Sequence, residues 1–201
     1  EYLDGIGTVI PRAMVTVRSR VDGELMAVHF REGQRVRDGE LLAEIDPRPF
    51  QVQLAQAEGA LARDQALLAN AKVDLQRYRA LAKEDAVPAQ QRDTQEALVR
   101  QFEAALVVDQ GQIDAAKLNL VYSKITSPVD GRIGLRLLDP GNIVHANDAG
   151  GLAVVTQLRP IDVVFTIPED ELPPVLAKVH AGERLVVDAF DRERHERLGQ
   201  G

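Results

Sequence analysis

The sequence Ser19-Arg20-Val21-Asp22-Gly23 returns 108 residues later as Ser127-Pro128-Val129-Asp130-Gly131. In both copies Asp-Gly stands between β-branched residues, which is a strong hairpin-turn signal because glycine accepts positive φ. A second glycine, Gly33 or Gly141, follows ten residues later and marks another tight turn. One such half is too small to bury its own apolar face. The repeat therefore predicts one small β-sandwich, made of two halves packed face to face. The expected structural turn glycines are Gly23, Gly33, Gly131 and Gly141.

The residues between the two copies have the composition of helices. Residues 50–120 are dominated by Ala, Gln, Leu, Arg and Asp, and their only proline is Pro88. A seven-residue repeat of apolar side chains, typical of coiled-coil packing, runs through both parts of this stretch. Its members are Leu54, Leu61, Leu68 and Leu75, then Leu106, Ile113 and Leu120. Asp64 and Asp109 interrupt the pattern, and the sequence leaves open whether they face water or a neighbouring protomer.

The segment Ala82–Pro88 divides the helical stretch into two arms. Proline is tolerated in the first turn of a helix and excluded from its interior. One helix should therefore end near Ala82, and a second should begin near Pro88. The short link predicts antiparallel neighbours, so we expect an α-helical hairpin with arms of about 50 Å.

Composition and charge exclude several classes of protein. The chain has 24 Lys and Arg against 31 Asp and Glu, a net charge of −7, which lacks the basic surface of general nucleic-acid binders. It has no cysteine, which excludes disulfides, thiolate zinc sites and thiol nucleophiles. The 201 residues start at Glu1 without a signal-peptide pattern, and no membrane span occurs. We expect any anchor or export signal to lie outside them.

The sequence offers no candidate catalytic, cofactor-binding or metal-ligating residue. The four histidines, at positions 29, 145, 180 and 195, are scattered, with no pair at metal-ligand spacing. No nucleophile elbow, phosphate-binding loop or dinucleotide fingerprint occurs. A lipoyl or biotinyl carrier is a further alternative. Such carriers hold the modified lysine in the turn between their two halves, where this chain has the hairpin.

Two segments resemble the lipoyl half-motifs of periplasmic adaptor proteins. Residues 18–23 with 31–36 resemble the first half-motif, and residues 125–134 resemble the second. These adaptors, also called membrane fusion proteins, serve resistance–nodulation–division (RND) multidrug efflux pumps. The run Thr16–Pro47 is especially similar to the MdtA subgroup.

The resemblance implies a multi-domain α+β fold. A lipoyl-like (biotinyl-lipoyl-like) β-sandwich would be split between residues 14–47 and 121–156, with the α-helical hairpin inserted at 48–120 and its tip near 82–88. Residues 1–13 and 157–201 would form part of a β-barrel domain. The expected protein binds no cofactor and is not an enzyme.

The resemblance also implies partners. Such an adaptor is attached to the inner membrane of a Gram-negative bacterium, through segments absent here. In the periplasm it bridges a proton-driven RND transporter to a TolC-like outer-membrane channel, and its copies, six in an assembled pump, form a sealed conduit. An adaptor of an ATP-driven efflux pump or of a type I secretion system is the open alternative, because these systems share the architecture. Type I secretion adaptors usually have longer hairpins.

At the hairpin tip the family carries an Arg, a Leu four residues later and a Ser seven residues after that. Arg77 and Leu81 stand at the first two places, and Pro88 replaces the Ser. The resemblance implies that these residues contact the channel, with the third contact changed because proline offers no hydroxyl.

Overall fold

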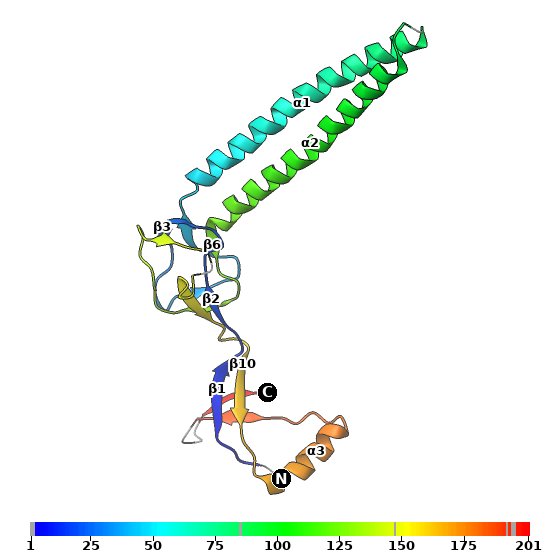
Figure 1. The fold of residues 1–201 in the computed structure, drawn as a ribbon. Coiled ribbons are helices and arrows are strands. Elements are labelled where there is room, and N and C mark those ends of the chain that lie inside the picture. Colours follow the sequence, from blue (N-terminus) through cyan, green and yellow to red (C-terminus); the bar gives the residue numbers. More distant parts are fainter. Residues whose placement is uncertain (1–2, 85, 147, 192, 194–195) are drawn as a thin grey trace. The chain divides into compact units, whose positions relative to one another are not determined.

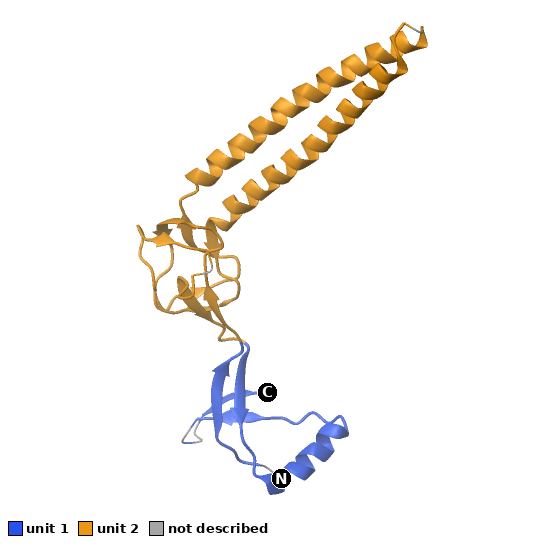
Figure 2. Ribbon diagram, viewed as in Figure 1, with its two compact units in different colours: residues 1–12, 160–201 blue, residues 13–159 orange. Residues whose placement is uncertain are grey.

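The computed structural model describes residues 3–84, 86–146, 148–191, 193 and 196–201 (Figure 1). Residues 1–2 of the expected barrel segment, Asp85 of the expected tip and His195 lie outside the described residues. The chain divides into two compact units (Figure 2). The larger is Ala13–Arg159, and the smaller combines Glu1–Arg12 with Pro160–Gly201.

The larger unit contains a β-sandwich and a helical hairpin. Its described strands form two four-stranded sheets, with the orders β2-β9-β7-β4 and β6-β5-β3-β8. The strands are β2 (Met14–Val17), β3 (Gly23–Val28), β4 (Arg35–Val36), β5 (Leu41–Ile45), β6 (Lys124–Thr126), β7 (Gly131–Ile133), β8 (Ile143–Val144) and β9 (Ala153–Thr156). Leu25, Ile45, Ile133 and Val155 form the centre of the core, each at most 1% exposed.

Each half of the repeat contributes two strands to each sheet. The expectation of two separate halves packed face to face is therefore wrong, because the halves interleave within both sheets. The reason is backbone hydrogen bonding. The two-residue strands β4 and β8 pair with β7 and β3 of the opposite half, which satisfies polar backbone groups that neither half could satisfy alone.

The strand pairing between the halves is reciprocal. Gly23 pairs with Val144, and at the offset of 108 residues Val36 pairs with Gly131. The turn amides follow the same rule: the N–H of Gly33 donates to Ile133 at 3.0 Å, and that of Gly141 donates to Leu25 at 2.8 Å. The two halves are thus related by an approximate twofold, and each completes the other.

The two aspartates of the Asp-Gly repeat also bond across the halves. The backbone N–H of Ala146 donates to the Asp22 carboxylate, and that of Asp38 donates to the Asp130 carboxylate at 2.9 Å. All four positions obey the 108-residue offset. Each aspartate therefore fixes a loop of the opposite half, beyond its role in its own turn.

The offset changes toward the end of the module. The Leu42-Ala43 pair of β5 corresponds to Leu152, just before β9, and Ala153, its first residue, which is a separation of 110 residues. The N–H of His29 donates to the carbonyl of Leu42, and that of Leu137 donates to the carbonyl of Leu152. The second half therefore holds two extra residues before β9, so this part of the repeat does not align at the 108-residue offset.

Two of the four repeat glycines adopt turn conformations for which glycine is favoured. Gly33 has φ +74° and Gly141 has φ +93°, and a Cβ at either would meet nothing within 4 Å. The Asp-Gly pattern predicts a turn with positive φ at Gly131. This prediction is wrong, because Gly131 begins strand β7 and does not have a positive φ. Glycine is required there by close approach instead: a Cβ would lie 2.5 Å from the carbonyl oxygen of Thr156.

Alanine substitutions should separate these two requirements. Gly131→Ala forces the β7–β9 backbones apart and should lower the free energy of unfolding by about 3 kcal/mol. Gly33→Ala keeps its space and carries only the left-handed strain of about 1 kcal/mol. Urea denaturation of both variants measures the difference, and equal losses would contradict the close-approach explanation.

Two long antiparallel helices form the hairpin (Figure 1). Helix α1 spans Arg48–Lys83 and helix α2 spans Ala89–Tyr122, with lengths of 36 and 34 residues. The heptad side chains face each other in a shared seam, and its buried apolar members are Ala57, Leu68, Ala71, Leu75, Val99, Ile113 and Ala116. Lys72 and Glu103 join the two helices at 2.8 Å beside this seam.

Asp64 and Asp109 are buried in the seam, with exposures of 9% and 7%. They therefore face neither water nor another protomer, the two alternatives that the sequence left open. The Arg63 guanidinium, whose Nε lies 2.6 Å from Oδ1 of Asp64, holds the pKa of Asp64 below its ordinary value, and the Asp109 side chain acts in the same direction. Oδ2 of Asp109 is buried without a hydrogen-bond partner among the described residues.

Replacing Asp109 should stabilise the hairpin. Asp109→Asn keeps the shape, removes a carboxylate and supplies N–H groups toward Asp64, so the free energy of unfolding should rise by about 1–3 kcal/mol. Asp114→Asn is the matched control, because Asp114 is exposed on the same helix and should change stability by less than about 0.5 kcal/mol. Thermal unfolding followed by circular dichroism tests this, and a loss of stability in Asp109→Asn would contradict it.

The smaller unit has the character of a half-barrel. Strand β1 (Gly7–Pro11) pairs antiparallel with β10 (Ile161–Phe165), and β11 (Asp188–Phe190) pairs with β12 (Arg197–Gln200). The 3-10 turn η1 (Glu169–Glu171) leads into helix α3 (Leu172–His180). All three acidic side chains of η1 lie at or near the surface, as a solvated turn requires.

Candidate functional site

The tip of the hairpin is the candidate functional site. The carbonyl of Leu81 accepts hydrogen bonds from the backbone N–H groups of Glu84 at 3.2 Å and Ala86 at 3.0 Å. These bonds close the last turn of α1 as the chain leaves it. Leu81 therefore has two roles, because its backbone terminates the helix while its side chain remains 41% exposed.

Arg77 and Leu81 lie one turn apart on α1, so their side chains share one face of the helix. The Arg77 side chain is 73% exposed and pairs with Asp74 at 3.1 Å. An exposed pair of this kind contributes little to stability, so the guanidinium can exchange Asp74 for another acceptor. The face thus offers a cation with five N–H donors beside an apolar side chain.

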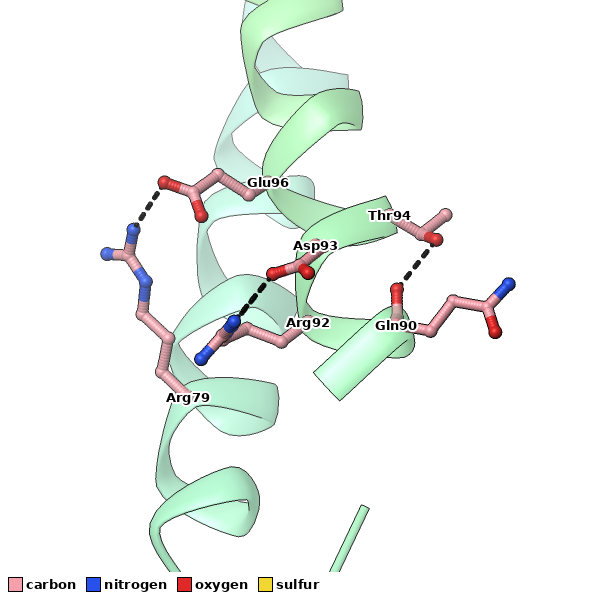
Figure 3. Close-up of polar contacts among 6 residues, drawn as sticks. All are labelled: Arg79, Gln90, Arg92, Asp93, Thr94 and Glu96. Carbon is pink, nitrogen blue, oxygen red and sulfur yellow. Dashed lines mark hydrogen bonds and ion pairs between the residues drawn. The ribbon is translucent and has the colours of Figure 1, made fainter. Parts of the chain in front are cut away.

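An ion pair joins the two helices just below the tip, and further polar contacts lie within α2 (Figure 3). Arg79 of α1 reaches across to Glu96 of α2, with Nη2 of the arginine 3.2 Å from Oε1 of the glutamate. On α2, Arg92 pairs with Asp93 at 2.7 Å. Sequence reasoning missed the Arg79–Glu96 contact, although opposite charges at mirrored positions of a hairpin are a usable signal for it.

Pro88 lies immediately before α2. Its φ of −62° and ψ of 141° place it at the N-cap, outside the first helical turn where it was expected. The reason is that helical ψ begins only at Ala89, and the Pro88 carbonyl accepts the N–H of Gln91 at 3.0 Å. Within the described part of the chain, no side chain caps this helix. The structure thus places Arg77 and Leu81 together on α1 and Pro88 across the loop, while the four repeat glycines lie in the sandwich.

A serine at position 88 should form a capping box with Gln91, three residues later. Pro88→Ser loses the rigidity of proline in the unfolded chain, so Pro88→Ala is the proper reference. The serine variant should be about 1 kcal/mol more stable than the alanine variant. Amide exchange at Gln90 and Gln91 should also slow in the serine variant. Identical exchange in both variants would contradict the N-cap assignment.

Two further kinds of feature are relevant along the described residues: a metal-ion site and a helix able to cross a membrane. Within the described ranges, no three His, Cys, Asp or Glu side chains converge in an arrangement that could hold a metal ion. None of the helices in these ranges combines the length and hydropathy needed to cross a membrane.

The family described as "RND MFP, barrel-sandwich hybrid domain" matches residues 13–156. The chain belongs to the RND membrane fusion protein family. The resemblance read from the two lipoyl half-motifs is therefore confirmed. Members of this family are adaptor components of transport systems and not enzymes.

Two similar curated proteins carry the same name. The chain is 54% identical over 201 residues to "Multidrug resistance protein MdtA" of Pectobacterium atrosepticum, covering 100% of this chain and 49% of that protein. It is 52% identical over 201 residues to the protein of the same name from Pantoea ananatis, again covering 49% of it. The similarity to the MdtA subgroup is thus confirmed. The chain spans about half the length of the curated relatives it matches.

Solved structures share the fold. MacA from Actinobacillus actinomycetemcomitans is 26% identical, with a TM-score of 0.55 over 81% of this chain and 56% of that chain. A putative efflux transporter from Bacteroides eggerthii is 24% identical, with a TM-score of 0.61 over 98% of this chain and 54% of that chain. The expected α+β fold with a helical hairpin and a partial barrel is confirmed.

Proposed function

We propose that this chain is the bridging part of a periplasmic adaptor in a multidrug efflux pump. The observation that carries the proposal is the hairpin inserted in a split β-sandwich, with Arg77 and Leu81 exposed at its end. Its 36-residue first helix extends about 54 Å at 1.5 Å per residue. Relatives named "Multidrug resistance protein MdtA" support the efflux assignment.

The partners follow from this role. The adaptor would lie in the periplasm of a Gram-negative bacterium, attached to the inner membrane. The half-barrel side would serve an inner-membrane RND transporter, and the hairpin tip would contact a TolC-like outer-membrane channel. Several copies, six in the assembled pump, would pack side by side and enclose a conduit. The protein would perform no chemistry, need no cofactor and act by positioning its partners.

The physical basis of tip binding is a small two-part contact. The Arg77 guanidinium would donate to backbone carbonyls or a carboxylate of the channel, and Leu81 would fill an apolar recess beside it. Precise placement of these side chains requires a stiff hairpin. The buried seam and the Arg79–Glu96 pair supply that stiffness, because they hold both helices at the base of the tip.

Aspartate substitutions in the full-length protein test the tip. Arg77→Asp reverses the charge offered to the channel, and Leu81→Asp places a carboxylate in the apolar contact. Each should lower drug resistance at least tenfold in minimal inhibitory concentration, while the melting temperature changes little because both side chains are exposed.

Matched controls come from the same hairpin. Leu67 occupies the same heptad position as Leu81, two repeats earlier, and is also 41% exposed. Arg100 is an exposed arginine of α2 away from the tip. Leu67→Asp and Arg100→Asp should retain resistance. Full resistance in Arg77→Asp and Leu81→Asp would refute the tip assignment, and equal losses in the controls would do so as well.

A further inference from the structure

Two carboxyl groups meet inside the hairpin seam, away from the tip. Asp64 of α1 and Asp109 of α2 are 9% and 7% exposed. The ion pair Lys72–Glu103 fixes the level at which the two helices face each other. Asp64 and Asp109 each lie about two helical turns nearer the sandwich than this pair. They therefore stand at nearly the same level, and their side chains are in contact across the seam.

The seam around the two aspartates is apolar. Ala57 and Ala71 occupy the same heptad position as Asp64, one repeat away on either side, and both are buried. On α2, the buried Ile113 lies one turn after Asp109. Surroundings of this kind supply no solvation for a charge, so an uncompensated carboxylate is costly there.

The charges at this level do not balance. Within the described ranges, the charged groups that act on Asp64 are Arg63 of the same helix and Asp109 of the other. Nε of Arg63 lies 2.6 Å from Oδ1 of Asp64. Oδ2 of Asp109 is buried and has no hydrogen-bond partner among the described residues. Two carboxylates with one guanidinium leave one negative charge over, on the side of Asp109.

The behaviour of Asp64 indicates what neutralises this charge. A hydrogen bond from Arg63 lowers the pKa of Asp64, and a hydrogen bond with the Asp109 side chain lowers that pKa further. A second carboxylate would have the opposite effect, because a like charge favours the protonated form. A hydrogen-bond donor has the observed effect, and an aspartate side chain is a donor only when its carboxyl is protonated.

We propose that the Asp64–Asp109 pair is a proton-binding site of the folded hairpin, with the proton on Asp109 and shared toward Asp64. A proton suits the site better than a metal ion, which takes more oxygen ligands than two aspartates supply. Release of the proton leaves two facing carboxylates, whose repulsion loosens the seam at this level. The inference is independent of the proposed function and describes a proton-sensitive segment of the hairpin.

The site gives hairpin stability a pH dependence of definite sign. Aspartate in the unfolded chain is ionised above about pH 4, so above that pH the folded hairpin binds one proton more than the unfolded chain. The stability that this proton provides is lost as the pH rises and the proton is released. The lowered pKa of Asp64 acts in the opposite direction, and only below about pH 4, where Asp64 becomes protonated. Measurements above pH 5 therefore report the shared proton.

Infrared difference spectroscopy of the full-length protein detects the proton directly. At pH 5 the wild type should show the C=O band of a buried protonated carboxyl, and this band should decrease by pH 8. Asp109→Asn and Asp64→Asn, which nearly keep the side-chain shape, should each lack the band. Asp114→Asn removes an exposed carboxylate of the same helix and should retain it. A wild type without the band at pH 5 would overturn the proposal, and a band that survives in Asp64→Asn would overturn the sharing.

Amide exchange measures the loosening of the seam. After correction for the intrinsic effect of pH, protection of residues 60–68 and 105–113 should fall about tenfold between pH 5 and pH 8. It should stay constant in Asp109→Asn. Arg63→Gln should move the fall to higher pH, because loss of the guanidinium favours the protonated pair. Constant protection in the wild type would overturn the loosening. Protection that follows added Mg²⁺ instead of pH would identify a metal ion as the occupant and overturn the proton site.

Discussion

The reciprocal pairing of the two half-repeats is the constraint on which the rest of the structure depends. Neither half can bury its apolar side chains or satisfy its edge strands alone, so the halves must meet. Their meeting places β5 beside β6, with Glu44 opposite Lys124. The chain therefore leaves the sandwich and returns to it at neighbouring points. Everything between those points must run out and back, which makes the inserted helices antiparallel.

The hairpin trades some stability for a defined geometry. Its seam is made of small and branched apolar side chains, and it is interrupted by the buried carboxylates of Asp64 and Asp109. A buried polar pair costs stability compared with an apolar seam, but it has its partner at one register only. Register matters for the proposed tip contact, because Arg77 and Leu81 keep their place at the end of the hairpin only if both helices end at the same level. The cross-helix pairs Lys72–Glu103 and Arg79–Glu96 act in the same direction.

The surface charges of the two half-repeats differ at equivalent positions. The twofold duplicates backbone geometry but leaves the outward side chains free to differ. The core positions therefore remain equivalent, as Leu25 and Ile133 show, while the outer positions Glu24 and Arg132 have opposite charge. The duplicated module therefore presents two unlike surfaces on one backbone plan.

The sequence by itself determined the elements and their order, because turn glycines, heptads and prolines act over a few residues. The split repeat, the helical insertion and the Arg77–Leu81 spacing could all be predicted from it. The tertiary structure alone decided which strands share a sheet, that Gly131 serves close approach, and that Asp64 and Asp109 are buried. It also decided that Arg35 and Arg132 are neighbours. These features depend on contacts between residues far apart in the chain. Local periodicity does not specify which residues of distant strands pair, and the two extra residues before β9 shift the second half of the repeat out of alignment with the first.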